Sequence, residues 1–247
     1  GTVFALVQAS KQTQTDMSKR LYVTSLVQAN NCSHQYKLKV SGFEPKPPDT
    51  GLLAGILFEN AAKIYLPRTE ISAKEAVLAA NENNLPENIL NFVEFALEKL
   101  PDELKTAETA DFSVFAEREL GGFMLAGYVD LVADGAIYEL KYTQKYINEP
   151  QKAHIFQLQH YMYLLDRDEA TIVYACNTKK PAVLAFKVRR WSEHKYFALI
   201  RGLANRYYED APLGLIHDWL CDYCAFSHVC EYKNEQNEVY LSYDSTK

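Results

Sequence analysis

The 247-residue sequence contains few cysteines and no long apolar segment, and each absence excludes a class of protein. Five cysteines are too few for a secreted disulfide scaffold of this length. No run of about 18 apolar residues occurs, so no transmembrane helix is expected. The opening residues are too few for a signal peptide and have no basic start. We therefore expect a cytoplasmic protein with no membrane partner.

An excess of positive charge is also absent, because the formal net charge is -6. This balance excludes a protein that coats nucleic acid by bulk charge, but a catalytic groove needs only local positive charge. Local basic residues occur at Lys141, Lys145, Lys152, Lys179, Lys180, Lys187, Arg189 and Arg190. The sequence also lacks a G-x4-G-K-[ST] loop. A helicase acting with this chain would therefore be a separate protein or lie outside this sequence.

Hydrophobic periodicity predicts an α/β protein. Helical spacing indicates helices at 25–32, with Ser25 as a possible N-cap, and at 52–66, 72–81, 87–100, 151–165 and 191–208. Alternating or apolar runs indicate strands at 112–120, 123–132, 136–142, 171–177 and 182–189. Short turns at Gly121-Gly122 and Asp134-Gly135 exclude parallel pairing of the first three strands, whereas the helix after them allows a crossover. We expect one domain over 1–247, with a core of about 25–210 and a mixed sheet flanked by helices.

Two carboxylates and a lysine are predicted to share one face of this sheet. Asp130 lies between Val129 and Leu131, so it points to the opposite face of its strand. Glu139 and Lys141 are two residues apart and share a face of the next strand. The Asp134-Gly135 hairpin brings Asp130 and Glu139 onto neighbouring strands.

This arrangement suits phosphodiester hydrolysis. Two carboxylates supply hard oxygen ligands for Mg²⁺ or Mn²⁺, and the metal can activate water and neutralise phosphate charge. Lys141 can orient the water or stabilise the transition state. A structural ion pair on a half-exposed hairpin is the alternative interpretation.

A further pair of residues follows on the next helix, where Gln157 and Tyr161 are four apart and share one face. Together with Asp130 and the Glu139-x-Lys141 pair, they resemble the RecB-like branch of the PD-(D/E)XK nuclease superfamily. The resemblance implies that Gln157 and Tyr161 line the site and position substrate or Lys141. It also implies that the Leu140 carbonyl assists the metal.

One position departs from that family pattern. RecB-like nucleases place a histidine on the first core helix after a glycine, whereas Gly55-Ile-Leu-Phe-Glu59 has a glutamate there. We expect Glu59 to reach the metal directly or through water; a solvated helix glutamate is the alternative. The six histidines, His34, His154, His160, His194, His217 and His228, are interpreted as surface or packing residues.

Four cysteines form a second candidate site. Cys221, Cys224 and Cys230 lie close together, and Cys32 lies near the start of the sequence. Four thiolates suit either zinc or an iron–sulfur cluster, and spacing alone does not separate the two. One upstream and three downstream cysteines resemble the iron–sulfur subgroup of RecB-like nucleases, which implies a 4Fe-4S cluster that ties segment 218–232 to Cys32. Cys176 lies in an apolar strand and is interpreted as a buried core residue.

The resemblance extends to function. It implies an exonuclease that acts on single-stranded DNA, like CRISPR-associated exonucleases and AddB-type nuclease domains. CRISPR adaptation, recombination and repair all remain open as pathways, with a helicase or CRISPR adaptation proteins as partners. The alternative is a catalytically inactive DNA-binding or scaffold protein with the same fold and cluster.

Overall fold

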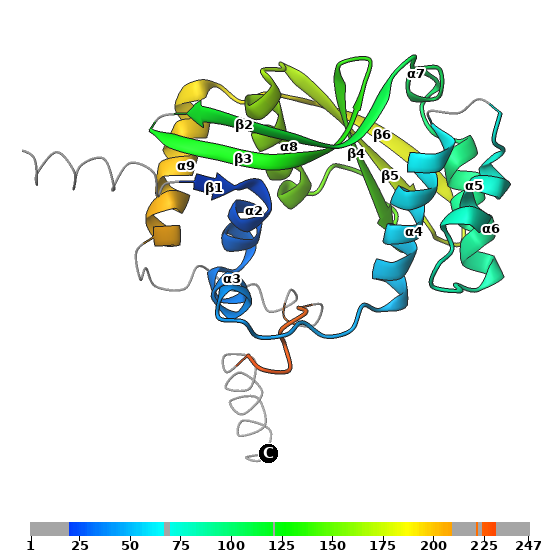
Figure 1. The fold of residues 1–247 in the computed structure, drawn as a ribbon, viewed down its shortest axis with the longest axis horizontal. Coiled ribbons are helices and arrows are strands. Elements are labelled where there is room, and N and C mark those ends of the chain that lie inside the picture. Colours follow the sequence, from blue (N-terminus) through cyan, green and yellow to red (C-terminus); the bar gives the residue numbers. More distant parts are fainter. Residues whose placement is uncertain (1–19, 67–69, 121, 209–220, 222–223, 231–247) are drawn as a thin grey trace, which may run out of the picture.

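The computed structural model describes residues 20–66, 70–120, 122–208, 221 and 224–230 (Figure 1). In chain order its helices and strands are β1 (Arg20–Tyr22), α2 (Val23–Asn31), α3 (Ser33–Val40), α4 (Thr50–Tyr65), α5 (Ala73–Ala80), α6 (Glu87–Glu98), α7 (Asp102–Lys105), β2 (Ala110–Leu120), β3 (Phe123–Ala133), β4 (Ala136–Thr143), α8 (Lys152–Leu165), β5 (Glu169–Cys176), β6 (Ala182–Arg189) and α9 (Glu193–Tyr208). The described residues include no helix long and apolar enough to cross a membrane.

The strands form one mixed six-stranded sheet in the order β1-β3-β4-β5-β6, with β2 also paired to β3. Strands β2, β3 and β4 form an antiparallel meander, as their short turns require. Strand β5 runs parallel to β4 because α8 carries the chain back between them, and β6 is antiparallel to β5. The predicted mixed sheet flanked by helices is confirmed.

Helices pack on both faces of the sheet and enclose two apolar clusters (Figure 1). The α4-side core joins α4, α5 and α6 to Leu131, Tyr138, Leu140 and Val173 of the sheet. The α8-side core joins α2, α8 and α9 to Val129, Ile137, Ile172 and Tyr174. Neighbouring residues of β5 therefore enter opposite cores, as the alternation of side chains along a strand demands.

The N-terminal segment differs from its prediction. Helix α2 begins at Val23 and its N-cap is Tyr22, which makes no side-chain cap, so the expected cap at Ser25 was wrong. Burial explains the earlier start, because Val23 and Leu26 are almost fully buried in the α8-side core. By contrast, Ser72 caps α5 and forms a reciprocal capping box with Glu75.

Three short elements had no clear sequence signal: β1, α3 and α7. Strand β1 has three residues and pairs in parallel with β3 from Arg20↔Met124 to Tyr22↔Ala126. Helix α3 has a weak apolar stripe, and the Cys32 sulfur at its N-cap accepts a hydrogen bond from the Gln35 backbone N–H. These elements depend on contacts with distant parts of the chain, which local periodicity does not record.

Candidate active site

Asp130 lies where the pairing of β3 is interrupted on both sides. Strands β2 and β3 pair from Ala110↔Ala133 to Leu120↔Phe123. The pairing is missing at one position within this range, where Ser113 would face Asp130. Ser113 has a left-handed backbone with φ 54°, which a non-glycine residue rarely adopts. On the other side, the β3–β4 register ends at Leu131↔Tyr138, one position before Asp130 would meet Glu139. The two carboxylate-bearing residues therefore face each other where the strands separate.

Glu139 and Lys141 face the α8 side of the sheet. Their neighbours in the parallel β4–β5 register are Ile172 and Tyr174, both members of the α8-side core. The Glu139 side chain is fully buried and forms an ion pair with Lys141. The Lys141 Nζ lies 3.8 Å from Asp130 Oδ2, and this lysine is 24% exposed at its side chain. One ammonium group thus lies between two carboxylates.

Burial dominates the electrostatics of this group. Removal from water raises the pKa of Glu139 to about 8; the Lys141 charge opposes this rise and the Asp130 charge adds to it. Burial acts to lower the pKa of Lys141, but the charges of Glu139 and Asp130 outweigh it and raise that pKa. Lys141 therefore stays charged at neutral pH, whereas Glu139 holds a proton for much of the time.

Helix α8 presents Gln157 and Tyr161 to the same group. The Tyr161 hydroxyl donates to Asp130 Oδ1 at 3.2 Å, and Gln157 Nε2 donates to the Tyr161 hydroxyl at 2.7 Å. Burial raises the pKa of Tyr161, and the nearby carboxylates raise it further, so its hydroxyl keeps its proton. The structure thus links both helix residues to Asp130; no hydrogen bond from Gln157 to Lys141 occurs within the described residues.

Glu59 lies on α4, on the other side of the sheet. Helix α4 packs closely on β4, since a Cβ at Gly55 would lie 3.8 Å from the Tyr142 Cβ. The Glu59 carboxylate pairs with Lys63 at 2.7 Å, and its side chain is 41% exposed. Its charge nevertheless reaches Lys141, whose pKa it helps to raise. Leu140 buries its side chain in the α4-side core, between the strand positions of Glu139 and Lys141.

The residues at this site fit a divalent cation. Both Glu139 carboxylate oxygens are buried, and their ion-pair partner, the Lys141 ammonium, also lies near Asp130. Two carboxylates that share one ammonium are costly to bury unless a further cation or a proton compensates the second negative charge. Asp130 supplies a second carboxylate, and carboxylate oxygens are ligands that suit Mg²⁺ or Mn²⁺. Among the described residues, however, no three His, Cys, Asp or Glu side chains gather closely enough to hold a metal ion.

His154 is the site neighbour that sequence reasoning missed. It lies three residues before Gln157 and seven before Tyr161, so all three share one face of α8. Its Nδ1 lies 2.8 Å from the hydroxyl of Tyr174, the β5 residue paired with Lys141. The spacing i, i+3, i+7 was the available signal. By contrast, His160 is a packing residue as predicted, fully buried with Nδ1 2.8 Å from the Tyr196 hydroxyl.

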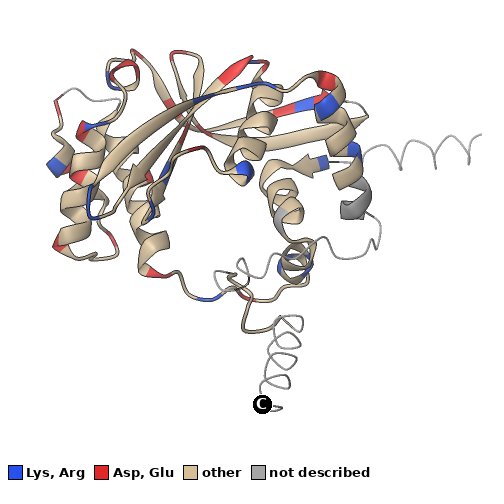
Figure 2. Ribbon diagram, turned by 180° about the vertical axis from the view of Figure 1, so that it is seen from behind, with Lys and Arg blue, Asp and Glu red and all other residues tan. Residues whose placement is uncertain are grey.

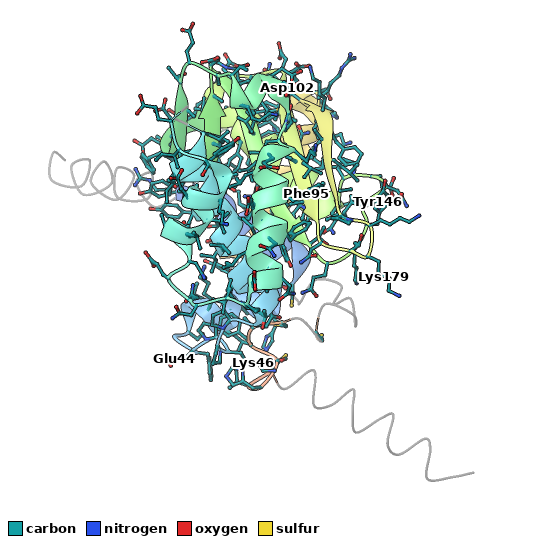
Figure 3. The ribbon with its side chains drawn as sticks, turned by 90° about the vertical axis from the view of Figure 1, so that its right-hand side faces the viewer. Glu44, Lys46, Phe95, Asp102, Tyr146 and Lys179 are labelled. Carbon is teal, nitrogen blue, oxygen red and sulfur yellow. The ribbon has the colours of Figure 1, made fainter. Side chains whose placement is uncertain are left out.

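The cysteine residues lie in two segments that pack together. Leu38 of α3 contacts Phe226 and Cys230, and Lys46 donates from its backbone to the Ala225 carbonyl and from Nζ to Ser227 (Figure 3). The sulfur of Cys224 accepts a hydrogen bond from the Phe226 backbone N–H at 3.4 Å. Positions 218–220, 222–223 and 231–232 of the predicted segment lie outside the described residues. Cys176 is fully buried in the α8-side core, as predicted.

The family of the chain follows from comparison with known proteins. A model of the PD-(D/E)XK nuclease superfamily matches residues 20–231, which include the carboxylates, the lysine and the cysteines at positions 32, 221, 224 and 230. The chain belongs to the PD-(D/E)XK nuclease superfamily. The mixed sheet and its flanking helices are those expected of such a core. A comparison with curated protein sequences found no relative.

Solved structures share this fold. The crystal structure of SSO0001 is 20% identical, with a TM-score of 0.50 over 94% of this chain and 98% of that chain. A structure from Eubacterium rectale, described as a putative exonuclease, is 12% identical, with a TM-score of 0.52 over 76% of this chain and 79% of that chain. At these identities the likeness shows the fold alone.

Proposed function

We propose that the chain is a Mg²⁺- or Mn²⁺-dependent deoxyribonuclease that hydrolyses phosphodiester bonds at Asp130, Glu139 and Lys141. The observation that carries this proposal is the fully buried Glu139 carboxylate, which lies beside Asp130 and shares one ammonium, that of Lys141, with it. A buried carboxylate beside a second carboxylate is expensive for a purely structural role. A site that binds a dication during function explains why the chain tolerates it.

Each residue then has a role. Asp130 and Glu139 would hold the metal, with the Leu140 carbonyl and Glu59 as further ligands, directly or through water. When bound, the metal supplies positive charge at the phosphate and activates water. Lys141 keeps its ammonium proton and stabilises negative charge that develops on the phosphate. Tyr161 and Gln157 fix the orientation of Asp130 by hydrogen bonds.

The substrate proposed is single-stranded DNA, cut from an end. Support comes from the RecB-like sequence pattern and from the structural neighbour described as a putative exonuclease. Acidic and basic residues are interspersed over the described structure, so substrate binding depends on local charge near the site (Figure 2). A role in CRISPR adaptation, recombination or repair, with a helicase or adaptation proteins as partners, is part of the same proposal.

Cleavage of end-labelled DNA tests the proposal. Wild type with Mn²⁺ should shorten single-stranded DNA faster than duplex, and the metal chelator EDTA should stop the reaction. Asp130→Asn and Lys141→Ala should each lower the rate by at least about 100-fold without a change in thermal midpoint, as expected when a group needed in the transition state is lost. Equal cutting by wild type and Asp130→Asn would place the active site elsewhere.

We further propose that Cys32, Cys221, Cys224 and Cys230 hold a metal centre, a 4Fe-4S cluster rather than zinc. Support comes from the packing of the two cysteine segments and the N–H donors to the Cys32 and Cys224 sulfurs. Iron content, visible absorbance and zinc content of chain purified without oxygen distinguish the two centres. Loss of thermal stability in Cys224→Ser, but not in Cys176→Ser made as a control for thiol loss, is the expected structural signature. Absence of both metals would refute the centre.

An inactive DNA-binding or scaffold protein is the second candidate. The observation that favours it is Glu59, whose carboxylate forms an ion pair with Lys63 and does not join Asp130 and Glu139 in a three-ligand group among the described residues. Under this alternative the chain binds DNA without cutting it, and Glu59→His restores a ligand type of the RecB-like pattern. Cleavage gained by Glu59→His would support the alternative. A wild-type rate that falls in Glu59→Gln, but not in Lys63→Gln, would refute it.

A further inference from the structure

We propose that His154 is a substrate-binding residue whose Nε2–H donates a hydrogen bond to a phosphate oxygen of the nucleic acid strand beside Lys141. This inference rests on the proposed function and adds a residue to its site. Sequence reasoning assigned His154 to packing or surface, and the RecB-like pattern quoted above contains no equivalent. The argument rests on its place on α8, on its bond to Tyr174 and on its contrast with His160.

The topology places His154 next to Lys141. Because α8 returns the chain between two parallel strands, its N-terminal turn lies near the carboxyl end of β4. His154 is in that turn. Tyr161 lies about two turns further along the same face of α8 and donates a hydrogen bond to Asp130. Tyr174 is the β5 neighbour of Lys141 in the register, and its hydroxyl contacts His154. One helix face therefore follows the row of site residues from Asp130 to Lys141.

The hydrogen bonds around Tyr174 fix which ring nitrogen of His154 carries the proton. The Gln151 backbone N–H donates to the Tyr174 hydroxyl at 3.0 Å, so this oxygen already accepts one bond. Its own proton then needs an acceptor, and His154 Nδ1 at 2.8 Å is the acceptor that the described residues provide. Nδ1 is thus the acceptor, and Nε2 holds the hydrogen.

The electrostatics keep this donor neutral. Burial lowers the pKa of His154 to about 4, and the Lys141 charge lowers it further. A neutral imidazole with Nε2–H is a hydrogen-bond donor that adds no charge to the site. His154 is partly exposed, and no hydrogen bond to its Nε2 occurs within the described part of the chain. The donor is therefore available to a ligand.

His160 supplies a matched comparison on the same helix. Its Nδ1 also lies 2.8 Å from a tyrosine hydroxyl, and burial lowers its pKa to about 3. Its Nε2, however, is buried and has no hydrogen-bond partner among the residues that the structure describes. Both histidines contact a tyrosine hydroxyl through Nδ1, but only His154 is partly exposed to solvent. A difference in DNA binding between their variants therefore depends on whether a ligand can reach the Nε2 atom.

Two substitutions of His154 distinguish the loss of its hydrogen-bond donor from the loss of its packing contacts. The amide nitrogen of glutamine can take the place of Nε2, whereas asparagine reaches only the position of Nδ1. His154→Asn should weaken binding of a labelled single-stranded oligonucleotide in Ca²⁺ by about tenfold, the effect of one hydrogen bond to a charged group. His154→Gln should lose less than about threefold, and His160→Asn should bind like wild type.

Further readouts exclude a merely structural role. In cleavage assays with Mn²⁺, His154→Asn should raise KM and leave kcat nearly unchanged, because the bond is present before the transition state. The salt dependence of binding should keep its wild-type slope, since a neutral donor releases no counterion. Tyr174→Phe removes the hydroxyl that fixes the proton of His154 on Nε2. This substitution should therefore also weaken binding of the oligonucleotide.

The outcomes are distinct. A fall in kcat at constant KM, equal losses in His154→Asn and His160→Asn, or a reduced salt slope would each overturn the role of His154. Wild type that binds the oligonucleotide but never cuts it refutes the nuclease while the binding comparison still decides on His154. Wild type that binds no oligonucleotide overturns the inference itself.

Discussion

At the scale of single residues, the site buries a carboxylate, although burial disfavours its charged form. Glu139 is fully buried, faces Asp130 across separating strands and has one cation, Lys141, as its ion-pair partner. Burial therefore raises its pKa, whereas Lys141 keeps its proton. Additional positive charge would balance the second carboxylate, and this is the electrostatic basis of the metal binding proposed above.

Metal affinity should consequently depend on pH through Glu139. Its pKa of about 8 lies above neutrality, so below pH 8 a proton must leave before the carboxylate can bind a dication. Affinity for Mn²⁺ should rise by up to about tenfold per pH unit toward pH 8 and level off above it. Isothermal titration across this range checks the prediction. Glu139→Gln should bind weakly at every pH, and a slope that persists in this variant would assign the proton to another group.

At the scale of elements, close contact between β3 and the start of α2 positions the strand that carries Asp130. A Cβ at Gly127 would lie 2.8 Å from Val23 Cγ2, closer than real Cβ atoms come to a neighbour, and 3.1 Å from Val23 Cβ, which is a tight contact. Since Gly127 is three residues before Asp130, glycine at this position lets α2 cover β3 near the site.

Gly127→Ala should therefore destabilise the chain by about 1–3 kcal/mol, the usual cost of forcing an extra methyl group into a packed core. Gly202→Ala on α9 is the matched control, because no described atom lies within 4 Å of its added Cβ. That change should be neutral or stabilise by up to about 1 kcal/mol through helix propensity. Chemical denaturation of both variants measures the difference, and equal stabilities would show that α2 shifts without cost.

At the scale of the whole molecule, a half-buried histidine, His154, and a fully buried one, His160, connect stability to pH. The pKa values of His154 and His160 are lowered by burial to about 4 and about 3, whereas an unfolded histidine titrates near its ordinary value of 6.5. The unfolded chain therefore binds more protons between pH 6.5 and about 4, so folding stability is retained above pH 6.5 and declines as pH falls.

Each histidine should contribute a loss of up to about 1.4 kcal/mol per pH unit in this range. His160→Gln should flatten the decline, because its side chain no longer binds a proton in the unfolded state. The exposed His194→Gln serves as the control for a change of side chain alone. Unfolding free energies measured by denaturation from about pH 7 to pH 4 test this; identical slopes in wild type and His160→Gln would contradict it.

Much of the fold could be predicted because its signals are local. The Asp134-Gly135 turn predicted the β3–β4 hairpin, and the alternation along β4 predicted that Glu139 and Lys141 share a face. Along β3 the expected alternation was wrong at the site: Val129 enters the α8-side core and Leu131 the α4-side core, because the strand pairing is interrupted at Asp130. The i, i+4 spacing of Gln157 and Tyr161 likewise placed both on one face of α8. The missed elements β1, α3 and α7 are short and are stabilised by distant contacts, for which periodicity carries no signal.

The sequence by itself determined the order of the longer helices and strands, the pairing of the central hairpin and the residue types of the site, because turn geometry and side-chain alternation act over a few positions. The tertiary structure alone decided where the strands separate around Asp130, how deeply Glu139 is buried and that Glu59 pairs with Lys63. It alone brought His154 beside Tyr174 and Lys141. These features depend on the packing of segments distant in sequence, and packing decides burial and electrostatics.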